Sequence, residues 1–329
     1  MELNGIKKEP VLIVGEGKLV YSVVVCLLQS GYAVVLCTEN KHKAAENIAI
    51  HYADLTQHTA QVINRKLLDI TDVLDSELPY KMAIVITEEA VLKKKLLIEQ
   101  LENKLPAHAV IAINTESIPL STLQEGCHYP ERIIGLNWSE PAHTTYFLEI
   151  IATGKNKMAL VDQLADTAKT SWGKDPYIVS GGLGIRAKMI AAMTREAFFL
   201  VSNGYASIED IDRACRNDPG YYLPFAGNFR YIDLMGGACS YGRVMKDLNP
   251  ELSKDSTIPE FFIESIEKLK RPAEKNKGLY QYQESDSKKL AETFRRFSYQ
   301  IQRIMEKYPF NYKRENAVSS TTINRSINE

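Results

Sequence analysis

The chain has 329 residues, of which 45% are hydrophobic and 25% are charged, and its formal net charge is −1. This length is sufficient for two domains, and the near-zero charge gives no electrostatic reason to expect nucleic acid or an anionic membrane as a partner. No apolar run approaches the roughly 20 residues that span a bilayer, and we expect no signal peptide. The five cysteines are scattered without a C-x-x-C pair, which predicts reduced thiols, no metal site and a cytoplasmic location.

The first predicted elements along the chain form a βαβ unit. Residues 11–14 are a short β-branched run that is typical of a buried parallel strand. A helical pattern follows and ends at Gly31, and residues 33–37 provide a second strand. The turn between the first strand and the helix contains Gly15 and Gly17, where a dinucleotide-binding loop would lie.

The glycine turn is an incomplete dinucleotide-binding motif. Two glycines allow the tight turn and the approach of the backbone to a pyrophosphate, but the third, which normally lets helix and strand pack closely, is replaced by Val20. An acidic residue is expected at the end of the second strand, but this position is Thr38. Glu39, one residue later, is therefore our candidate for the ribose contact. On this motif alone, a turn that binds no nucleotide is an equal alternative.

Two more buried strands are predicted at residues 82–86 and 110–113. Residues 39–80, which precede them, have a polar and helical character. Glu89 and Lys94 follow the first of these strands on a predicted helix. Alone, they are typical of a helix start with favourable early acids and solvated lysines.

Polar residues follow the next two strands directly. A polar run begins at Asn114, and the apolar residues 133–136 lead into Asn137. The chain then turns at Pro141 and resumes as an apolar strand that carries Glu149. Because open α/β sheets bind ligands at the carboxyl ends of their strands, we expect these side chains to face one crevice.

These motifs resemble, in their order, the 3-hydroxyacyl-CoA dehydrogenase family over roughly residues 10–282. The family reads G-L-H-F-F-N-P and then L-V-E-V-I where this chain carries Asn137 and Glu149, and N-T-S-S at residues 114–117. The resemblance implies an α/β Rossmann-like dinucleotide-binding domain followed by an all-helical domain. It also implies NAD as cofactor and an acyl-CoA or related small-molecule substrate of fatty acid metabolism.

The resemblance also implies a role for individual residues. Catalytic roles fall on Glu149, Asn137 and Ser117, and cofactor contacts fall on Gly15, Gly17, Glu89, Lys94 and Asn114. Glu39 is our own candidate for a further cofactor contact, because the family's acidic position is Thr38 here. Substrate contacts fall on Glu116, Glu140 and Arg186, where Arg186 takes the place of the family's substrate-side asparagine in a loose match over residues 180–186.

The position of the family's catalytic histidine is the main departure. Histidine transfers protons near neutral pH, whereas the amide of Asn137 donates and accepts hydrogen bonds but does not titrate. Loss of general acid–base assistance typically lowers rates by about 10²–10⁴-fold. Asn137 would still be able to polarise a carbonyl. His143 is the nearest histidine, and we regard it as a solvated loop residue rather than a replacement.

Three carboxylates and one guanidinium are expected around the crevice. Glu116, Glu140 and Glu149 would serve as acid and base, hold a cation, or lie apart in solvent. Arg186 would either bind a carboxylate on the substrate or neutralise one of these acids, and we favour neutralisation.

Two functional hypotheses follow from the sequence. The first is an NAD-dependent oxidoreductase that acts on the C3 hydroxyl or keto group of an acyl-CoA or related hydroxy acid. The alternative is a catalytically silent homologue that binds a nucleotide, an acyl-CoA or a protein partner.

The predicted domain organisation has three parts. Residues 1–180 are predicted to form a Rossmann-like NAD-binding domain, residues 181–313 a helical domain for dimerisation and substrate binding, and residues 314–329 a disordered polar tail. A helix after residue 283 carries an apolar stripe, which must pack on its own domain or on a second subunit. We expect a homodimer through the helical domain.

Overall fold

The computed structural model describes residues 9–75, 77–269, 279–280 and 283–309. The predicted polar tail, residues 314–329, lies outside this part of the chain. The chain forms two compact units. Of the described residues, those from 9 to 192 and the short segment 294–299 belong to the sheet unit, and the others belong to the helical unit.

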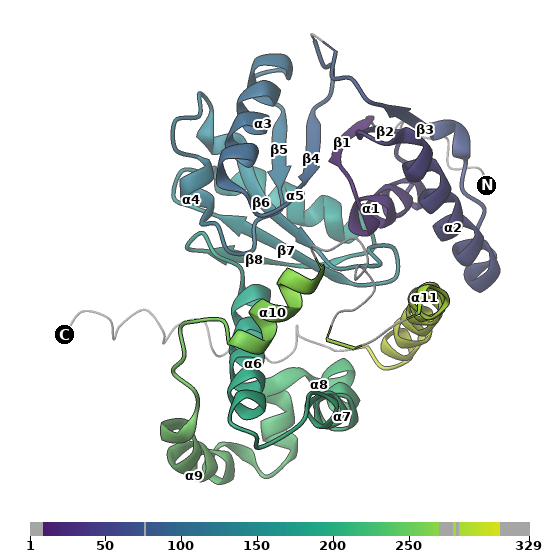
Figure 1. Ribbon diagram of the computed structural model, residues 1–329. Coiled ribbons are helices and arrows are strands. Elements are labelled where there is room, and N and C mark those ends of the chain that lie inside the picture. The colour runs from purple at the N-terminus through teal and green to yellow at the C-terminus, as the bar shows by residue number, and fades with distance from the viewer. Residues whose placement is uncertain (1–8, 76, 270–278, 281–282, 310–329) are drawn as a thin grey trace. The chain divides into compact units, whose positions relative to one another are not determined.

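The sheet unit is built on an eight-stranded sheet in the order β3-β2-β1-β4-β5-β6-β7-β8 (Figure 1). The strands are β1 (Val11–Gly15), β2 (Val34–Cys37), β3 (Leu68–Thr71), β4 (Met82–Ile86), β5 (Val110–Ile113), β6 (Ile133–Trp138), β7 (Phe147–Ala152) and β8 (Asp175–Ser180). Strands β1 to β6 are parallel, β7 is antiparallel to β6, and β8 is parallel to β7. The predicted α/β fold with a largely parallel sheet is confirmed.

Helices cover both faces of this sheet. They are α1 (Lys18–Gln29), α2 (Lys41–Thr59), α3 (Val91–Lys104), α4 (Leu120–Leu123) and α5 (Met158–Ser171). Alternate residues of β1 enter different cores, because successive side chains of a strand point to opposite faces. Val11 and Ile13 pack with α1, α2 and α5, whereas Leu12 and Val14 pack with α3 and α4. The sheet is therefore buried on both sides, as its continuous apolar strands predict.

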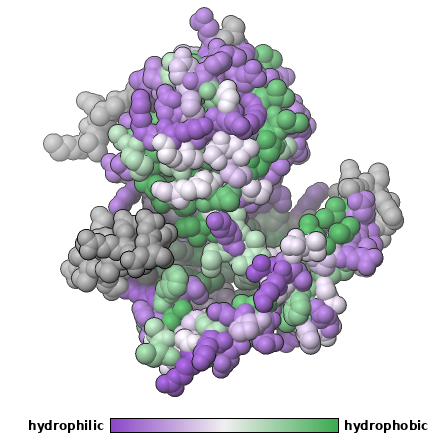
Figure 2. All heavy atoms as spheres, turned by 90° about the vertical axis from the view of Figure 1, so that its left-hand side faces the viewer, coloured by the Kyte–Doolittle hydropathy of each residue, from purple (hydrophilic) through white to green (hydrophobic). Residues whose placement is uncertain are grey.

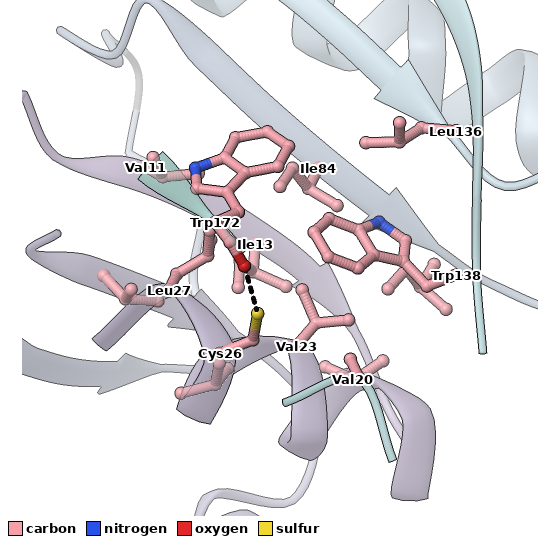
Figure 3. Close-up of a cluster of buried hydrophobic side chains, with 14 of the residues drawn as sticks. Val11, Ile13, Val20, Val23, Cys26, Leu27, Ile84, Leu136, Trp138 and Trp172 are labelled. Atoms are coloured by element: carbon pink, nitrogen blue, oxygen red, sulfur yellow. Dashed lines mark hydrogen bonds between the residues drawn. The ribbon is translucent and has the colours of Figure 1, made fainter. Parts of the chain in front are cut away.

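Two tryptophans fill the core on the α1 side of the sheet (Figure 3). The rings of Trp138, at the end of β6, and Trp172, after α5, lie 5.5 Å apart. The thiol of Cys26 lies 3.7 Å from the carbonyl oxygen of Trp172. Cys26 is one of five free cysteines, so the predicted reduced thiols are confirmed.

The segment 39–80 differs from the prediction of a wholly helical stretch. Helix α2 ends at Thr59, and Leu68–Thr71 forms the edge strand β3 beside β2. This strand has only four residues, Leu-Asp-Ile-Thr, and none of them is fully buried. So short and half-polar an edge strand lacks the apolar run that identified the other strands.

The helical unit follows along the chain. It contains most of α6 (Ile185–Ser202), then α7 (Ile208–Asn217), α8 (Pro219–Leu234), α9 (Gly237–Leu248), α10 (Glu260–Leu269) and both ends of α11 (Glu284–Lys307). Among its described residues only Ala226 and Ser253 are buried. Figure 2 shows hydrophobic side chains interspersed with hydrophilic ones on the visible surface. No described helix is long and apolar enough to cross a membrane.

Candidate active site

The sheet reverses its winding direction between β1 and β4, which is where open α/β sheets bind nucleotides. Gly15 ends β1 opposite Ile86 at the end of β4. A Cβ atom on Gly15 would overlap the carbonyl oxygen of Ile86 and lie 3.1 Å from its carbonyl carbon, and the φ of Gly15 is +149°. Only glycine fits this turn, so the first glycine of the motif has a structural reason here.

The second glycine leaves the space that a pyrophosphate needs. Gly17 caps the start of α1 with φ of +106°, and a Cβ atom there would meet nothing within 4 Å. The free backbone N–H groups of a helix N-terminus attract phosphate. Val20 is fully buried and packs against the Gly15 turn, so the loop keeps its shape without the third glycine.

The end of β2 carries the predicted ribose contact. Thr38 is buried, and its N–H donates to the carbonyl of Thr71, whereas Glu39 is exposed directly after it. The nearby lysines are paired with acids: Lys41 Nζ lies 3.0 Å from Asp72. A second exposed pair joins α2 to the glycine loop at 3.1 Å, between Lys43 and Glu16. Glu39 is therefore left open to solvent at the rim of the switch point.

A buried lysine links the ends of β4 and β5. Lys94 Nζ donates to the carbonyl oxygen of Asn114 at 2.6 Å and to its Oδ1 at 2.8 Å. The Asn114 amide also bonds in both directions with the backbone of Thr87, at 2.9 and 3.0 Å. Burial lowers the pKa of Lys94, although the carboxylates of Glu89 and Glu116 oppose that effect. Lys94 is thus a fixed internal hydrogen-bond donor and not a solvated lysine at a helix start, which was the alternative that the sequence left open.

Glu89 accepts a hydrogen bond from the backbone N–H of Glu116 at 2.6 Å. This contact brings the start of α3 to the end of β5. Glu116 in turn accepts from Arg186 Nη1 at 2.7 Å, so the favoured prediction that Arg186 neutralises a carboxylate is confirmed. Ser117 lies exposed next to Glu116, at the end of the same polar run.

Asn137 and Glu149 are directly opposite each other on the antiparallel strands β6 and β7. Both side chains are buried, and Asn137 Nδ2 donates to Glu149 Oε2 at 3.0 Å. The other amide hydrogen donates to the carbonyl of Thr115 at 2.8 Å, and Oδ1 accepts from the Thr115 N–H at 2.8 Å. Both N–H bonds of the amide are therefore used inside the protein, and the carbonyl polarisation expected of this amide has no donor available.

Glu149 is a fully engaged carboxylate. Its Oε1 accepts from the Tyr177 hydroxyl at 3.0 Å and from the backbone N–H groups of Ile185 and Arg186 at 2.6 and 3.2 Å. Helix α6 begins at Ile185, so the negative charge lies at a helix N-terminus, where it is stabilised. Gly184 makes this contact possible, because a Cβ atom there would overlap Glu149 Oε2 and lie 2.8 Å from Cδ.

Tyr177 was not recognised in the sequence. It lies on β8, beside Glu149 in the parallel register, and burial followed by the Glu149 charge raises the pKa of its hydroxyl. Its ring meets the Phe147 ring edge-on at 5.9 Å. The register of two neighbouring strands decides this pairing, and a single sequence gives no signal for it.

Two other predicted residues lie away from the Asn137–Glu149 pair. Burial raises the pKa of Glu140, and the positive charges of Lys18 at the start of α1 and of Arg295 oppose this effect. His143 is buried, not solvated as predicted, and its ring lies 5.1 Å from that of His51 on α2. The described residues contain no group of three acids, histidines or cysteines that would hold a metal ion. Glu116, Glu140 and Glu149 accordingly do not form such a group among the described residues.

Comparisons with known proteins identify the chain. The model of the 3-hydroxyacyl-CoA dehydrogenase NAD-binding domain matches residues 10–181, and that of the family's C-terminal domain matches residues 185–282. The chain belongs to the 3-hydroxyacyl-CoA dehydrogenase family. Its amino-terminal part is the family's NAD-binding domain, and NAD is its cofactor. The residues at the switch point fit the nucleotide, since Gly17 leaves open space in front of α1.

Relatives within this family differ in substrate. The chain is 29% identical over 199 residues to 5-formyl-3-hydroxy-2-methylpyridine 4-carboxylate 5-dehydrogenase of Mesorhizobium japonicum, covering 60% of this chain and 64% of that protein. It is 26% identical over 322 residues to L-carnitine dehydrogenase of Bacillus cereus, covering 94% and 95%. It is 27% identical to a multifunctional β-oxidation protein of Brassica napus, covering 84% of this chain but only 38% of that protein. The chain thus spans less than two thirds of two of these relatives.

Solved structures support the same fold. The crystal structure of a 5-formyl-3-hydroxy-2-methylpyridine 4-carboxylic acid 5-dehydrogenase matches with a TM-score of 0.81 at 24% identity, covering 90% of this chain and 98% of that one. An (S)-3-hydroxybutyryl-CoA dehydrogenase from Ralstonia eutropha matches with a TM-score of 0.63 at 20% identity, covering 84% and 99%.

Proposed function

We propose that the protein is an NAD-dependent oxidoreductase that transfers hydride between nicotinamide and the C3 hydroxyl or keto group of an acyl-CoA or related hydroxy acid. The observation that carries this proposal is the buried Asn137–Glu149 pair at the end of β6 and near the start of β7. The sequence resemblance assigns the family's histidine–glutamate pair to these two positions. The polar network of Lys94, Asn114 and Glu89 at the ends of β4 and β5 supports the proposal.

Each residue would contribute to binding rather than to proton transfer. Bound NAD supplies the hydride acceptor. Lys94 would act from inside the protein by holding Asn114 in place beside the nicotinamide ribose, and Glu39 would contact the adenosine ribose. Glu149 anchors the start of α6 and orients Asn137. Because Asn137 does not titrate, the substrate proton would exchange with solvent, and we expect turnover about 10²–10⁴-fold below that of a histidine enzyme.

A ligand-binding homologue without turnover is the second candidate. The observation that favours it is the saturation of the Asn137 amide, whose two N–H groups donate to Thr115 and Glu149. In that case the protein would bind NAD and a small molecule or a protein partner, but would not oxidise or reduce a substrate.

The deciding experiment compares the wild type with Asn137→His, using acetoacetyl-CoA and acetoacetate as substrates and following NADH consumption. We expect slow turnover by the wild type and an increase of about 10²-fold or more in the variant, because histidine restores the proton-transferring group. NADH binding is measured first by fluorescence titration. NADH binding with no turnover in either protein would favour the silent homologue and would contradict the proposed activity.

Thr115→Ala is the matched control for this experiment. It lies in the same network, and its backbone contacts with Asn137 do not depend on its side chain. We therefore expect this variant to keep the slow rate of the wild type. An equal gain in both variants would show that the gain does not come from the imidazole.

A further inference from the structure

Arg186 lies beside the Asn137–Glu149 pair. It is in the first turn of α6, and its backbone N–H donates to the Glu149 carboxylate at 3.2 Å. The charge of its side chain is close enough to influence the Tyr177 hydroxyl.

Two neighbours fix the direction of the Arg186 guanidinium. On one side Nη1 donates to Glu116 Oε1 at 2.7 Å. On the other side the guanidinium carbon lies 5.8 Å from the centre of the Phe147 ring, in the range of a cation–π contact. The Phe147 ring is itself held edge-on by Tyr177. An arginine confined in this way loses little rotamer entropy when it binds a ligand.

Most of the hydrogen-bonding capacity of Arg186 is unused. A guanidinium has five N–H donors in a fixed planar fork, and within the described part of the chain only one of them has an acceptor, Glu116. The Arg186 side chain is 30% exposed, so its remaining donors are accessible to a solute. The geometry that suits such a fork is a carboxylate bound through two parallel hydrogen bonds.

The exposed pair alone gives little reason for an arginine here. Ion pairs exposed to this degree contribute little to stability. A neutral thioester carbonyl would not require a cation beside the reacting carbon, whereas a free carboxylate two bonds from that carbon would. Arg186 provides a cation on a residue whose backbone N–H contacts Glu149.

We propose that Arg186 anchors the carboxylate of the substrate, so that this site takes a short 3-hydroxy or 3-oxo acid rather than its CoA thioester. This inference rests on the proposed function, because it names the substrate of the same site. It assigns Arg186 a specificity role beyond its ion pair with Glu116.

The test is binding to the protein loaded with NAD⁺, measured by isothermal titration calorimetry. The probes are 3-oxobutanoate, 3-oxohexanoate and their methyl esters, none of which can react with NAD⁺ by hydride transfer. We expect at least one acid to bind about 10–100-fold more tightly than its ester, the factor that a charged hydrogen-bonded pair provides. In Arg186→Gln this preference should disappear, and in Arg186→Lys part of it should remain, because the charge is kept and the fork is lost.

Arg213→Gln is the control, since it removes one positive charge from an exposed ion pair on α7. It should preserve the preference for the acid. Equal binding of acid and ester, no binding of either acid, or an unchanged preference in Arg186→Gln would overturn the inference. Turnover of the wild type and of Asn137→His is measured separately, so failure of the proposed function appears as NADH binding without turnover, whereas failure of the substrate assignment appears as loss of the preference for the acid.

Discussion

Gly184 is the residue on which the arrangement of the site depends most directly. The Glu149 carboxylate occupies the space where any side chain at this position would begin. In Gly184→Ala the buried carboxylate must move and lose hydrogen bonds from Tyr177, Ile185 or Arg186. Because a buried charge without its donors is unfavourable, we expect a loss of about 2–4 kcal/mol in unfolding free energy, measured by urea denaturation.

Gly154→Ala is the natural comparison for that measurement. Gly154 is exposed in the same unit, and a Cβ atom there would meet nothing within 4 Å. The comparison variant should stay within about 0.5 kcal/mol of the wild type. Equal stability of the two alanine variants would contradict the steric argument for Gly184.

At the scale of elements, the segment 294–299 of α11 is attached to the sheet unit by polar and aromatic contacts. Arg295 Nε lies 2.5 Å from Asp54 on α2, and the hydroxyl groups of Ser298 and Thr144 are 3.0 Å apart. Tyr299 is buried, and its ring lies 5.9 Å from that of His143. Two buried histidines, His51 and His143, lie next to this segment of α11.

These histidines make the stability of the sheet unit depend on pH. Burial lowers the pKa of His51 to about 4, with Arg295 adding to the effect and Asp54 opposing it. Burial lowers the pKa of His143 to about 3, assisted by His51, Lys174 and Arg295 and opposed by Ser22. In the unfolded chain both titrate near 6.5, so below that pH the unfolded state binds protons that the folded state does not.

The contribution of these two histidines to stability should therefore be constant above about pH 6.5 and become unfavourable as the pH decreases toward 4. Each histidine contributes a slope of about 1.4 kcal/mol per pH unit in this window. Urea denaturation between pH 7.5 and 4.5 measures the slope. The double substitution His51→Asn/His143→Asn should reduce the slope of unfolding free energy against pH by the amount that two protons contribute. The substitution of the exposed His42 by Asn should leave this slope unchanged. A slope that the double variant does not alter would refute the assignment.

The sequence predicted those elements whose side chains carry a strong apolar pattern. The strands at residues 82–86 and 110–113 are confirmed at both ends, because each is a continuous apolar run bounded by polar residues. Edge strand β3 was missed because its residues are half-exposed. Asn137 and Glu149 were correctly expected to face one place, whereas Tyr177, the His143 environment and the saturation of the Asn137 amide depend on strand register and tertiary packing.

At the scale of the whole molecule, the helical unit exposes many large apolar side chains. Tyr221, Phe229 and Met235 are 85%, 82% and 64% exposed, and the described residues of this unit include only two that are buried. Soluble monomers rarely leave so much apolar surface uncovered. We therefore retain the prediction of a homodimer through the helical unit.

Sedimentation equilibrium should detect the dimer, and Phe229→Asp should shift the protein toward the monomer by placing a charge in an apolar interface. Val62→Asp makes the same kind of change at a residue of the sheet unit that is 88% exposed, and it should not alter the mass. A wild-type protein that remains monomeric at all concentrations would contradict the prediction.

The attachment of residues 294–299 to the sheet unit also has a consequence for biosynthesis. Arg295 contacts a partner 241 residues earlier in the chain, and Ser298 contacts one 154 residues earlier. A ribosome that has released the complete β1–β8 sheet has therefore not yet released the segment that covers His51 and His143. Contacts so distant in sequence form late. A nascent chain would thus carry a sheet unit with an uncovered patch until more than a hundred further residues have been translated, and during this interval it is open to chaperones and proteases.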